Sequence, residues 1–122
     1  MTDSTTVPAV VVETGQAWLA LLDGGSYSQA WENAGASMHD CIDQPDFDKE
    51  MQSIRGPLGT VKSRDIKSQR RMVNPSGLPE GDYCFISCTT LFENKPNVSE
   101  TVMLELEQDG IWRIADYSCP LY

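Results

Sequence analysis

The sequence lacks any apolar run of about 20 residues, the length that a membrane-spanning helix needs. Its first residues also lack the basic region and apolar stretch of an export signal. We therefore expect a soluble chain without membrane insertion. A cytoplasmic location is favoured for the sequence as given, and the alternative is an exported protein whose signal lies outside that sequence.

Cations are scarce: nine lysines and arginines face 18 acids, for a net charge of −9. Such a charge repels phosphate backbones, so we expect no nucleic-acid partner. The exception is segment 61–72, which holds five cations and one acid. Two interpretations are open for it: cross-strand ion pairs with an acidic neighbour, or a site for an anion or partner.

Histidine occurs once, and the four cysteines include no C-x-x-C pair, which argues against a zinc site. Cys84 and Cys88 would lie about 13 Å apart on one strand, beyond the roughly 7 Å that a disulfide can bridge. We expect free and mostly buried thiols. Phosphate-binding glycine loops, H-E-x-x-H and G-x-S-x-G are also missing, so no metal and no cofactor is assigned.

Apolar spacings of three and four predict helices in the first half of the chain. The first covers about residues 7–23 and ends before Gly24 and Gly25. Ser26 and Gln29 form a capping-box pattern that opens a second helix, whose apolar face continues to residues 41–42. A short third helix starts at residues 45–46, which act as its cap, and ends at 56–57.

The second half of the chain predicts strands at about 60–73, 82–92, 98–107 and 111–117. Asp109 and Gly110 indicate a tight hairpin, and residues 74–81 are dense in turn formers. The strand at 82–92 alternates little, as expected if it is covered on both faces or lines a cavity. The order indicates one α+β domain, residues 1–122, with three N-terminal helices packed on a curved antiparallel sheet.

Periodicity also assigns faces to individual side chains. In the first strand, one face should carry Lys62, Arg64, Ile66, Arg70 and Met72. Six large apolar residues should be largely buried. They are Trp18, Leu22, Trp31, Phe85, Leu104 and Ile114.

Two motifs carry a resemblance to a known family. Residues 55–64 read R-x-P-L-G-x-x-x-S-R, and residues 112–117 read W-R-I-A-x-Y. The chain resembles a bacterial domain family of unknown function with cystatin-like, nuclear-transport-factor-2-like architecture. The resemblance implies a cone of bent sheet and helices but no activity, because that superfamily includes isomerases, dehydratases and purely binding or dimerising modules.

Arg55 and Arg64 flank a rigid Pro-Leu-Gly turn, so their guanidinium groups could together grip a carboxylate or phosphate. The structural alternative is equally concrete. Arg55 would bond the last carbonyls of the third helix, and Arg64 would pair with Glu100 or Glu105 across the sheet.

The aromatic residues either line a ligand cavity or form the core. Among them, Tyr27, Trp31 and Tyr83 are candidate ligand contacts. The single histidine, His39, could pair with Asp43 four residues later, an arrangement that is ordinary on a helix surface. Cys88 lacks a nearby base in the sequence and is not expected to act as a nucleophile.

Asp82, Glu100 and Asp116 lie on predicted strands, and a buried, unpaired carboxylate there could serve as a general base. Glu100 falls on the apolar face of its strand. A carboxylate paired with Arg64 or Arg113 would instead indicate a module without catalysis. The buried state of these acids therefore separates the two functional hypotheses.

We favour a non-catalytic module that binds a small apolar or anionic molecule, or that forms a homodimer through the sheet. No catalytic residue is assigned. The alternative is a small isomerase, dehydratase or hydrolase that uses a buried carboxylate as its base. The candidate ligand-binding residues are Tyr27, Trp31, Arg55, Arg64, Tyr83 and Glu100.

Overall fold

The computed structural model describes residues 6–120, which form four helices and one four-stranded sheet. The helices are α1 (Ala9–Asp23), α2 (Tyr27–Asn33), α3 (Ala36–Cys41) and α4 (Gln44–Arg55). The strands are β1 (Val61–Val73), β2 (Asp82–Phe92), β3 (Val98–Leu106) and β4 (Trp112–Ser118). The predicted α+β class and the four strand positions are confirmed.

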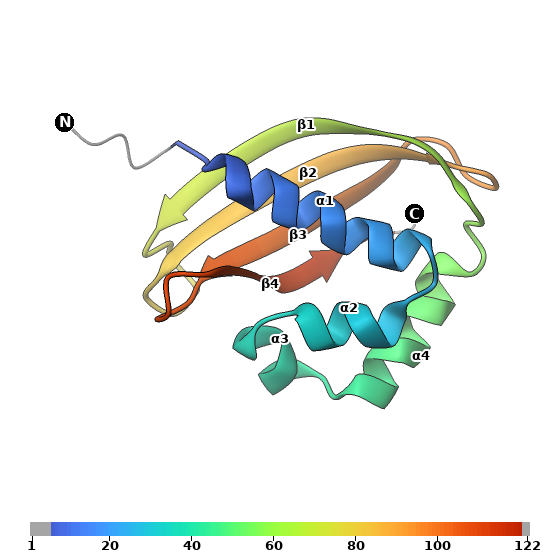
Figure 1. The fold of residues 1–122 in the computed structure, drawn as a ribbon. Helices are drawn as coiled ribbons and strands as arrows, with labels where there is room; N and C mark the ends of the chain where they lie inside the picture. The colour runs from blue at the N-terminus through green and yellow to red at the C-terminus, as the bar shows by residue number, and fades with distance from the viewer. Residues whose placement is uncertain (1–5, 121–122) are drawn as a thin grey trace.

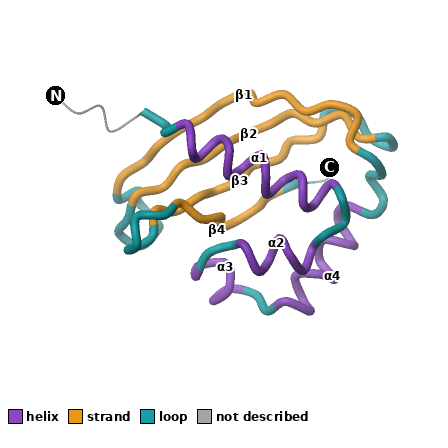
Figure 2. The backbone as a smooth tube through the Cα atoms, viewed as in Figure 1, coloured by secondary structure: helices purple, strands orange, loops and turns teal. Residues whose placement is uncertain are grey.

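The sheet is a meander in the order β1-β2-β3-β4, and each neighbouring pair is antiparallel. The strands curve around α1, which lies across one face of the sheet (Figure 1). The other helices follow on the same side, with α2 packed between α1 and α4 and with α3 against β4 (Figure 2). Among residues 6–120, no helix combines the length and apolar character that a membrane crossing needs.

The single helix predicted after Ser26 is two helices, because the chain is extended at Ala34 and Gly35. At this break the Gly35 N–H donates to the carbonyl of Ile114 on β4, at 2.8 Å. A Cβ on Gly35 would lie 2.5 Å from Glu107 Oε2 and 2.9 Å from Arg113 Cβ. Any larger residue here would force Glu107 and Arg113 to shift, and the bond from Gly35 to β4 lies where the helix ends.

Both predicted caps are wrong in detail. Ser26 is the N-cap of α2 but its side chain makes no capping hydrogen bond. For α4 the cap is Asp43, whose Oδ1 accepts from the Asp46 N–H at 3.0 Å, while Pro45 occupies the first turn. Proline suits that position because its missing N–H would be unpaired there in any case.

The predicted face of β1 holds for Arg64 and Ile66, but Lys62 is exposed at a first register shift between Val61 and Ser63. A register shift between Ile66 and Ser68 inserts one residue, a β-bulge, and reverses which side chains point inward. After the bulge Arg71, not Arg70, faces the helix side, where its guanidinium lies 5.7 Å from the Trp112 ring centre.

The core lies between the helices and the inner face of the sheet. Trp18, Leu22, Leu104 and Ile114 are buried there, as predicted. Trp31 and Phe85 are only half-buried. Phe85 points to the opposite face because side chains along β2 alternate. Of the two alternatives for β2, full coverage on both faces is therefore wrong, whereas the strand does line a cavity through Ile86 and Cys88.

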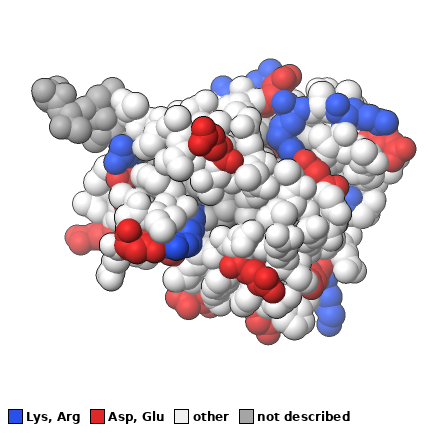
Figure 3. Space-filling view, in the orientation of Figure 1, with Lys and Arg blue, Asp and Glu red and all other residues white. Residues whose placement is uncertain are grey.

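Lysine and arginine side chains gather along the β1 edge in the space-filling view (Figure 3). Two of the cations in segment 61–72 form ion pairs, Arg64 with Asp23 and Glu100, and Arg71 with Asp82. The remaining three are exposed and form no ion pair within residues 6–120. These are Lys62, Lys67 and Arg70.

Candidate functional site

Four charged side chains from four elements meet beside the C-terminal end of α1. Asp23 ends α1, Arg55 ends α4, Arg64 lies on β1 and Glu100 lies on β3. We call these four residues the charge cluster. Two arginines face two carboxylates, so the cluster has no net charge when all four groups are ionised.

Asp23 bridges the two arginines. Its Oδ1 accepts from Arg55 Nη2 at 2.5 Å and from Arg64 Nη2 at 3.0 Å, and its Oδ2 accepts from Arg64 Nη1 at 2.8 Å. Burial by itself would raise the pKa of the Asp23 carboxyl, but the hydrogen bonds and charges of Arg64 and Arg55 outweigh it and lower that pKa. Asp23 is therefore held as a carboxylate.

Glu100 is completely buried, and both of its carboxylate oxygens accept hydrogen bonds. Its Oε1 accepts from Arg64 Nε at 2.9 Å and from the Thr90 hydroxyl at 2.5 Å, and its Oε2 accepts from the Tyr117 hydroxyl. Burial, together with the charge of Glu100, strongly raises the pKa of Tyr117. The tyrosine thus stays neutral and remains a donor to Glu100.

Arg55 is the most enclosed cation of the cluster, with a side chain 3% exposed. Its guanidinium lies 5.0 Å from the centre of the Phe92 ring, a cation–π distance. Nη2 bonds to Asp23, whereas Nε and Nη1 have no hydrogen-bond partner in the described part of the chain. Nη1 is 3.8 Å from Glu100 Oε2, so its contact with this carboxylate is electrostatic and not a hydrogen bond.

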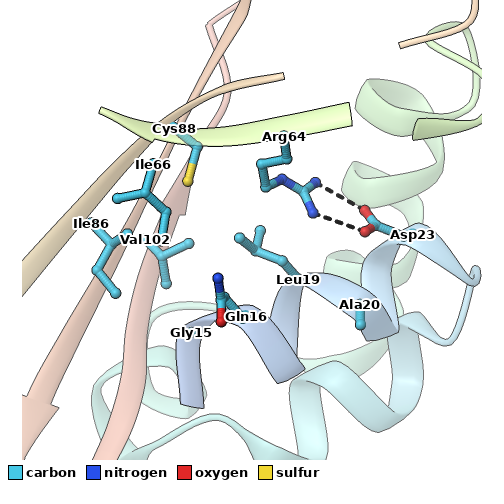
Figure 4. Close-up of a pocket in the computed structure, with 10 residues that line it drawn as sticks. All are labelled: Gly15, Gln16, Leu19, Ala20, Asp23, Arg64, Ile66, Ile86, Cys88 and Val102. Atoms are coloured by element: carbon cyan, nitrogen blue, oxygen red, sulfur yellow. Dashed lines mark hydrogen bonds and ion pairs between the residues drawn. The ribbon is translucent and has the colours of Figure 1, made fainter. Parts of the chain in front are cut away.

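A cavity of about 270 Å³ opens beside the cluster, between α1 and the inner face of the sheet (Figure 4). Asp23 and Arg64 form its charged end. Most of the remaining wall is apolar. The residues that line this α1–β1 cavity are Gly15, Gln16, Leu19, Ala20, Asp23, Arg64, Ile66, Ile86, Cys88 and Val102.

Gly15 brings the α1 backbone close to the sheet at the wall of this cavity. A Cβ at this position would lie 3.1 Å from Ile86 Cδ1, tighter than an ordinary contact. The glycine therefore sets the separation between helix and sheet, and it leaves space that a larger residue would fill.

The Cys88 thiol points toward the cavity in Figure 4. Burial raises the pKa of this thiol, which reduces its thiolate fraction near neutral pH. All four cysteines are free and only Cys41 is exposed, as predicted. Within residues 6–120, no group of three His, Cys, Asp or Glu side chains is arranged to hold a metal ion.

A family model for proteins of unknown function, DUF4019, matches residues 14–117. The chain belongs to the DUF4019 family. The match includes the whole charge cluster and every residue that lines the α1–β1 cavity. No curated protein matches the chain.

Of the six candidate ligand-binding residues, the structure brings three together in this DUF4019 chain: Arg55, Arg64 and Glu100. The predicted pairing of Arg64 with Glu100 is confirmed. Arg55 and Arg64 do grip one carboxylate together, as the sequence suggested, but it is the chain's own Asp23.

The other three candidates lie apart from the cluster and the cavity. Tyr27 and Trp31 belong to α2, where the Trp31 indole N–H donates to the Ile42 carbonyl at 2.9 Å. Tyr83 is buried near the start of β2, and its hydroxyl donates to the Pro79 carbonyl at 2.9 Å.

The proposed contact between His39 and Asp43 is wrong. Helix α3 ends at Cys41, so the two residues do not share a helix. The His39 ring instead lies tilted against Trp31, with the two ring centres 4.1 Å apart and with Nε2 2.7 Å from the Trp31 carbonyl oxygen. Asp43 is the cap of α4.

Sequence reasoning missed Asp23 as the centre of the site. Its partners lie 32 and 41 residues away, beyond the reach of helix or hairpin spacing. One signal was present: an acid at a helix C-terminus opposes the helix dipole and calls for a compensating cation. Thr90 and Tyr117 carried no such signal.

Proposed function

We propose that this DUF4019 domain is a non-catalytic module that binds a small, mainly apolar molecule in the α1–β1 cavity. The observation that carries the proposal is the cavity itself, about 270 Å³ with apolar walls and one charged end. Ligand sites in proteins commonly combine apolar walls with a few convergent polar groups. Cavities in this size range accept small molecules, since an engineered apolar cavity of about 150 Å³ binds benzene.

The state of the carboxylates favours binding over catalysis. A general base needs a free lone pair near the substrate and a pKa near the working pH. Glu100 is enclosed, with both oxygens engaged by Arg64, Thr90 and Tyr117. Asp23 does line the cavity, but its two arginine partners lower its pKa, which makes it a weak base.

The other two acids considered as bases are no better placed. Asp116 is exposed on β4, and Asp82 is held in a two-point ion pair by Arg71. The isomerase, dehydratase or hydrolase alternative therefore has no supporting group at the cavity. A measured turnover of a substrate would reinstate the enzyme hypothesis.

Filling the cavity tests the proposal. Ile66 lines it from β1 and is half-buried at the edge of the core, so Ile66→Trp places a large ring in the cavity without removing a fully buried side chain. Ile111, 50% exposed in the β3–β4 turn, offers the matched control Ile111→Trp. A library of small apolar fragments is screened against the three proteins by saturation-transfer NMR, with circular dichroism to verify folding.

We expect several fragments to bind the wild type and Ile111→Trp, and to lose at least about tenfold in affinity for Ile66→Trp, or about 1.4 kcal/mol. Fragments that bind all three proteins equally would place binding elsewhere. A screen without any fragment that requires the cavity would contradict the proposal.

Assembly through the sheet is a second candidate, and one observation favours it. No helix within residues 6–120 covers the outer face of the sheet, where Phe85 of β2 is paired with Met103 of β3. A homodimer through this face would bury both side chains, as in the dimerising modules of the nuclear-transport-factor-2-like architecture that the sequence resembles. Light scattering of the wild type and of Phe85→Glu tests it: the variant should be monomeric, and a monomeric wild type at high concentration would remove this candidate.

A further inference from the structure

At the polar end of the α1–β1 cavity, the contacts within the protein leave some hydrogen-bond donors and acceptors unused. Arg64 carries five N–H donors. Nε bonds to Thr90 and Glu100, and Nη2 contacts both Asp23 and Glu100. Nη1 donates to Asp23 Oδ2 alone within residues 6–120, so one of its two hydrogens remains.

Asp23 has an unused acceptor position that complements the unused donor of Arg64. Its Oδ1 accepts from both arginines, which fills its two lone pairs. Its Oδ2 accepts only from Arg64 Nη1 in the described chain, so one acceptor position remains there. A donor and an acceptor are thus free on two atoms that are 2.8 Å apart, and both residues line the cavity. A hydroxyl or carboxamide can satisfy both at once, because each of these groups donates and accepts.

The charges at this end disfavour an ionised ligand. Arg55 and Arg64 are already matched by Asp23 and Glu100, so no counter-charge is unpaired. An incoming carboxylate would be desolvated beside the Asp23 carboxylate, and an incoming ammonium beside the Arg64 guanidinium. Neither ion would gain an unpaired counter-charge to offset the hydration that it loses on entering the cavity.

The volume bounds the size of the molecule. By proportion to benzene in a cavity of about 150 Å³, a cavity of about 270 Å³ holds on the order of ten non-hydrogen atoms. The apolar walls, formed by Leu19, Ile66, Ile86 and Val102, match a hydrocarbon body.

We propose that the α1–β1 cavity selects a neutral molecule of about ten non-hydrogen atoms, with an apolar body and a hydroxyl or carboxamide that bridges Arg64 Nη1 and Asp23 Oδ2. This inference rests on the proposed binding function and specifies its ligand class. It differs from the broader expectation of an apolar or anionic ligand, because an anion is the class that the cluster rejects.

The test is a series of probes that share one ring and differ only in the head group. The probes are cyclohexylmethanol, cyclohexanecarboxamide, cyclohexanecarboxylate, cyclohexylmethylammonium and methylcyclohexane. Ligands of this size bind with dissociation constants of the order of millimolar. Each is titrated at pH 7 into wild-type protein with labelled methyl groups, and affinities are read from the shifts of Leu19, Ile66, Ile86 and Val102.

We expect the alcohol and the amide to bind about tenfold or more tightly than the carboxylate and the ammonium, because each ion loses hydration without gaining an unpaired counter-charge. Methylcyclohexane should bind more weakly than the alcohol. Equal or tighter binding of either ion, or equal binding of methylcyclohexane, would overturn the head-group assignment while leaving the cavity as a binding site. If no probe shifts the cavity methyls, the proposed binding function fails with it.

Discussion

Removing the charge of Glu100 tests whether the charge cluster acts as one ionic unit around its two buried members, Arg55 and Glu100. Glu100→Gln retains the shape of the side chain and one carbonyl oxygen that can accept from Arg64 and Thr90. It leaves two arginines, with side chains 3% and 15% exposed, opposite the single carboxylate of Asp23. The variant therefore buries an excess positive charge.

Loss of one partner from a buried ion pair typically costs 3–5 kcal/mol. Because the glutamine amide keeps part of the hydrogen bonding, we expect a loss near the lower end, about 3 kcal/mol in the free energy of unfolding. For a domain of this size that corresponds to a fall in Tm of about 10–15 °C. Total stabilities of about 5–15 kcal/mol leave the variant mostly folded at room temperature.

The assay is urea unfolding followed by tryptophan fluorescence at pH 7, with thermal unfolding alongside. Glu50→Gln is the matched control, because it makes the same chemical change at an exposed position of α4 and should alter the free energy by no more than about 0.5 kcal/mol. A loss below about 1 kcal/mol for Glu100→Gln would refute the reasoning, since the buried arginines would then not depend on this carboxylate.

Three further predictions concern Asp23, the cysteines and Gly35. The lowered pKa of Asp23 contributes stability that is present above pH about 4 and is lost as the pH falls through the folded-state pKa. Urea unfolding between pH 7 and 3 should therefore show that the free energy of unfolding falls less for Asp23→Asn than for the wild type. An equal fall with pH in the two proteins would contradict the pairing of Asp23 with the arginines. Iodoacetamide should alkylate Cys41 rapidly and Cys88 only slowly, as read by mass spectrometry, and rapid labelling of both in the folded protein would refute the burial of Cys88. Gly35→Ala should lower the free energy of unfolding by about 1–3 kcal/mol because its Cβ would lie 2.9 Å from Arg113 Cβ, which is fixed to the β4 backbone and cannot swing away. Gly77→Ala, in open space, reports only the strain of a positive φ.

Local patterns predicted the sheet well because strand spacing and turn chemistry are local properties. Asp109 and Gly110 identified the β3–β4 hairpin, and Gly110 indeed has a positive φ of 83°. Alternation in β3 correctly placed Glu100 on the buried face. These features depend on neighbours within a few residues of each other, which a sequence displays directly.

The features that were missed depend on contacts between distant segments. The break between α2 and α3 exists because Gly35 bonds to Ile114, which is far along the chain. The bulge in β1 depends on its register against β2. Asp23 looked like an ordinary helix-terminal acid until the fold placed Arg55 and Arg64 beside it.

The central claim is that a small molecule occupies the space between α1 and the inner face of the sheet. Intermolecular nuclear Overhauser effects between cyclohexylmethanol and labelled methyl groups test this location directly. We expect contacts from the ring to Leu19, Ile66 and Ile86. Contacts confined to exposed apolar residues such as Val10 and Leu91, with none to the cavity methyls, would contradict it.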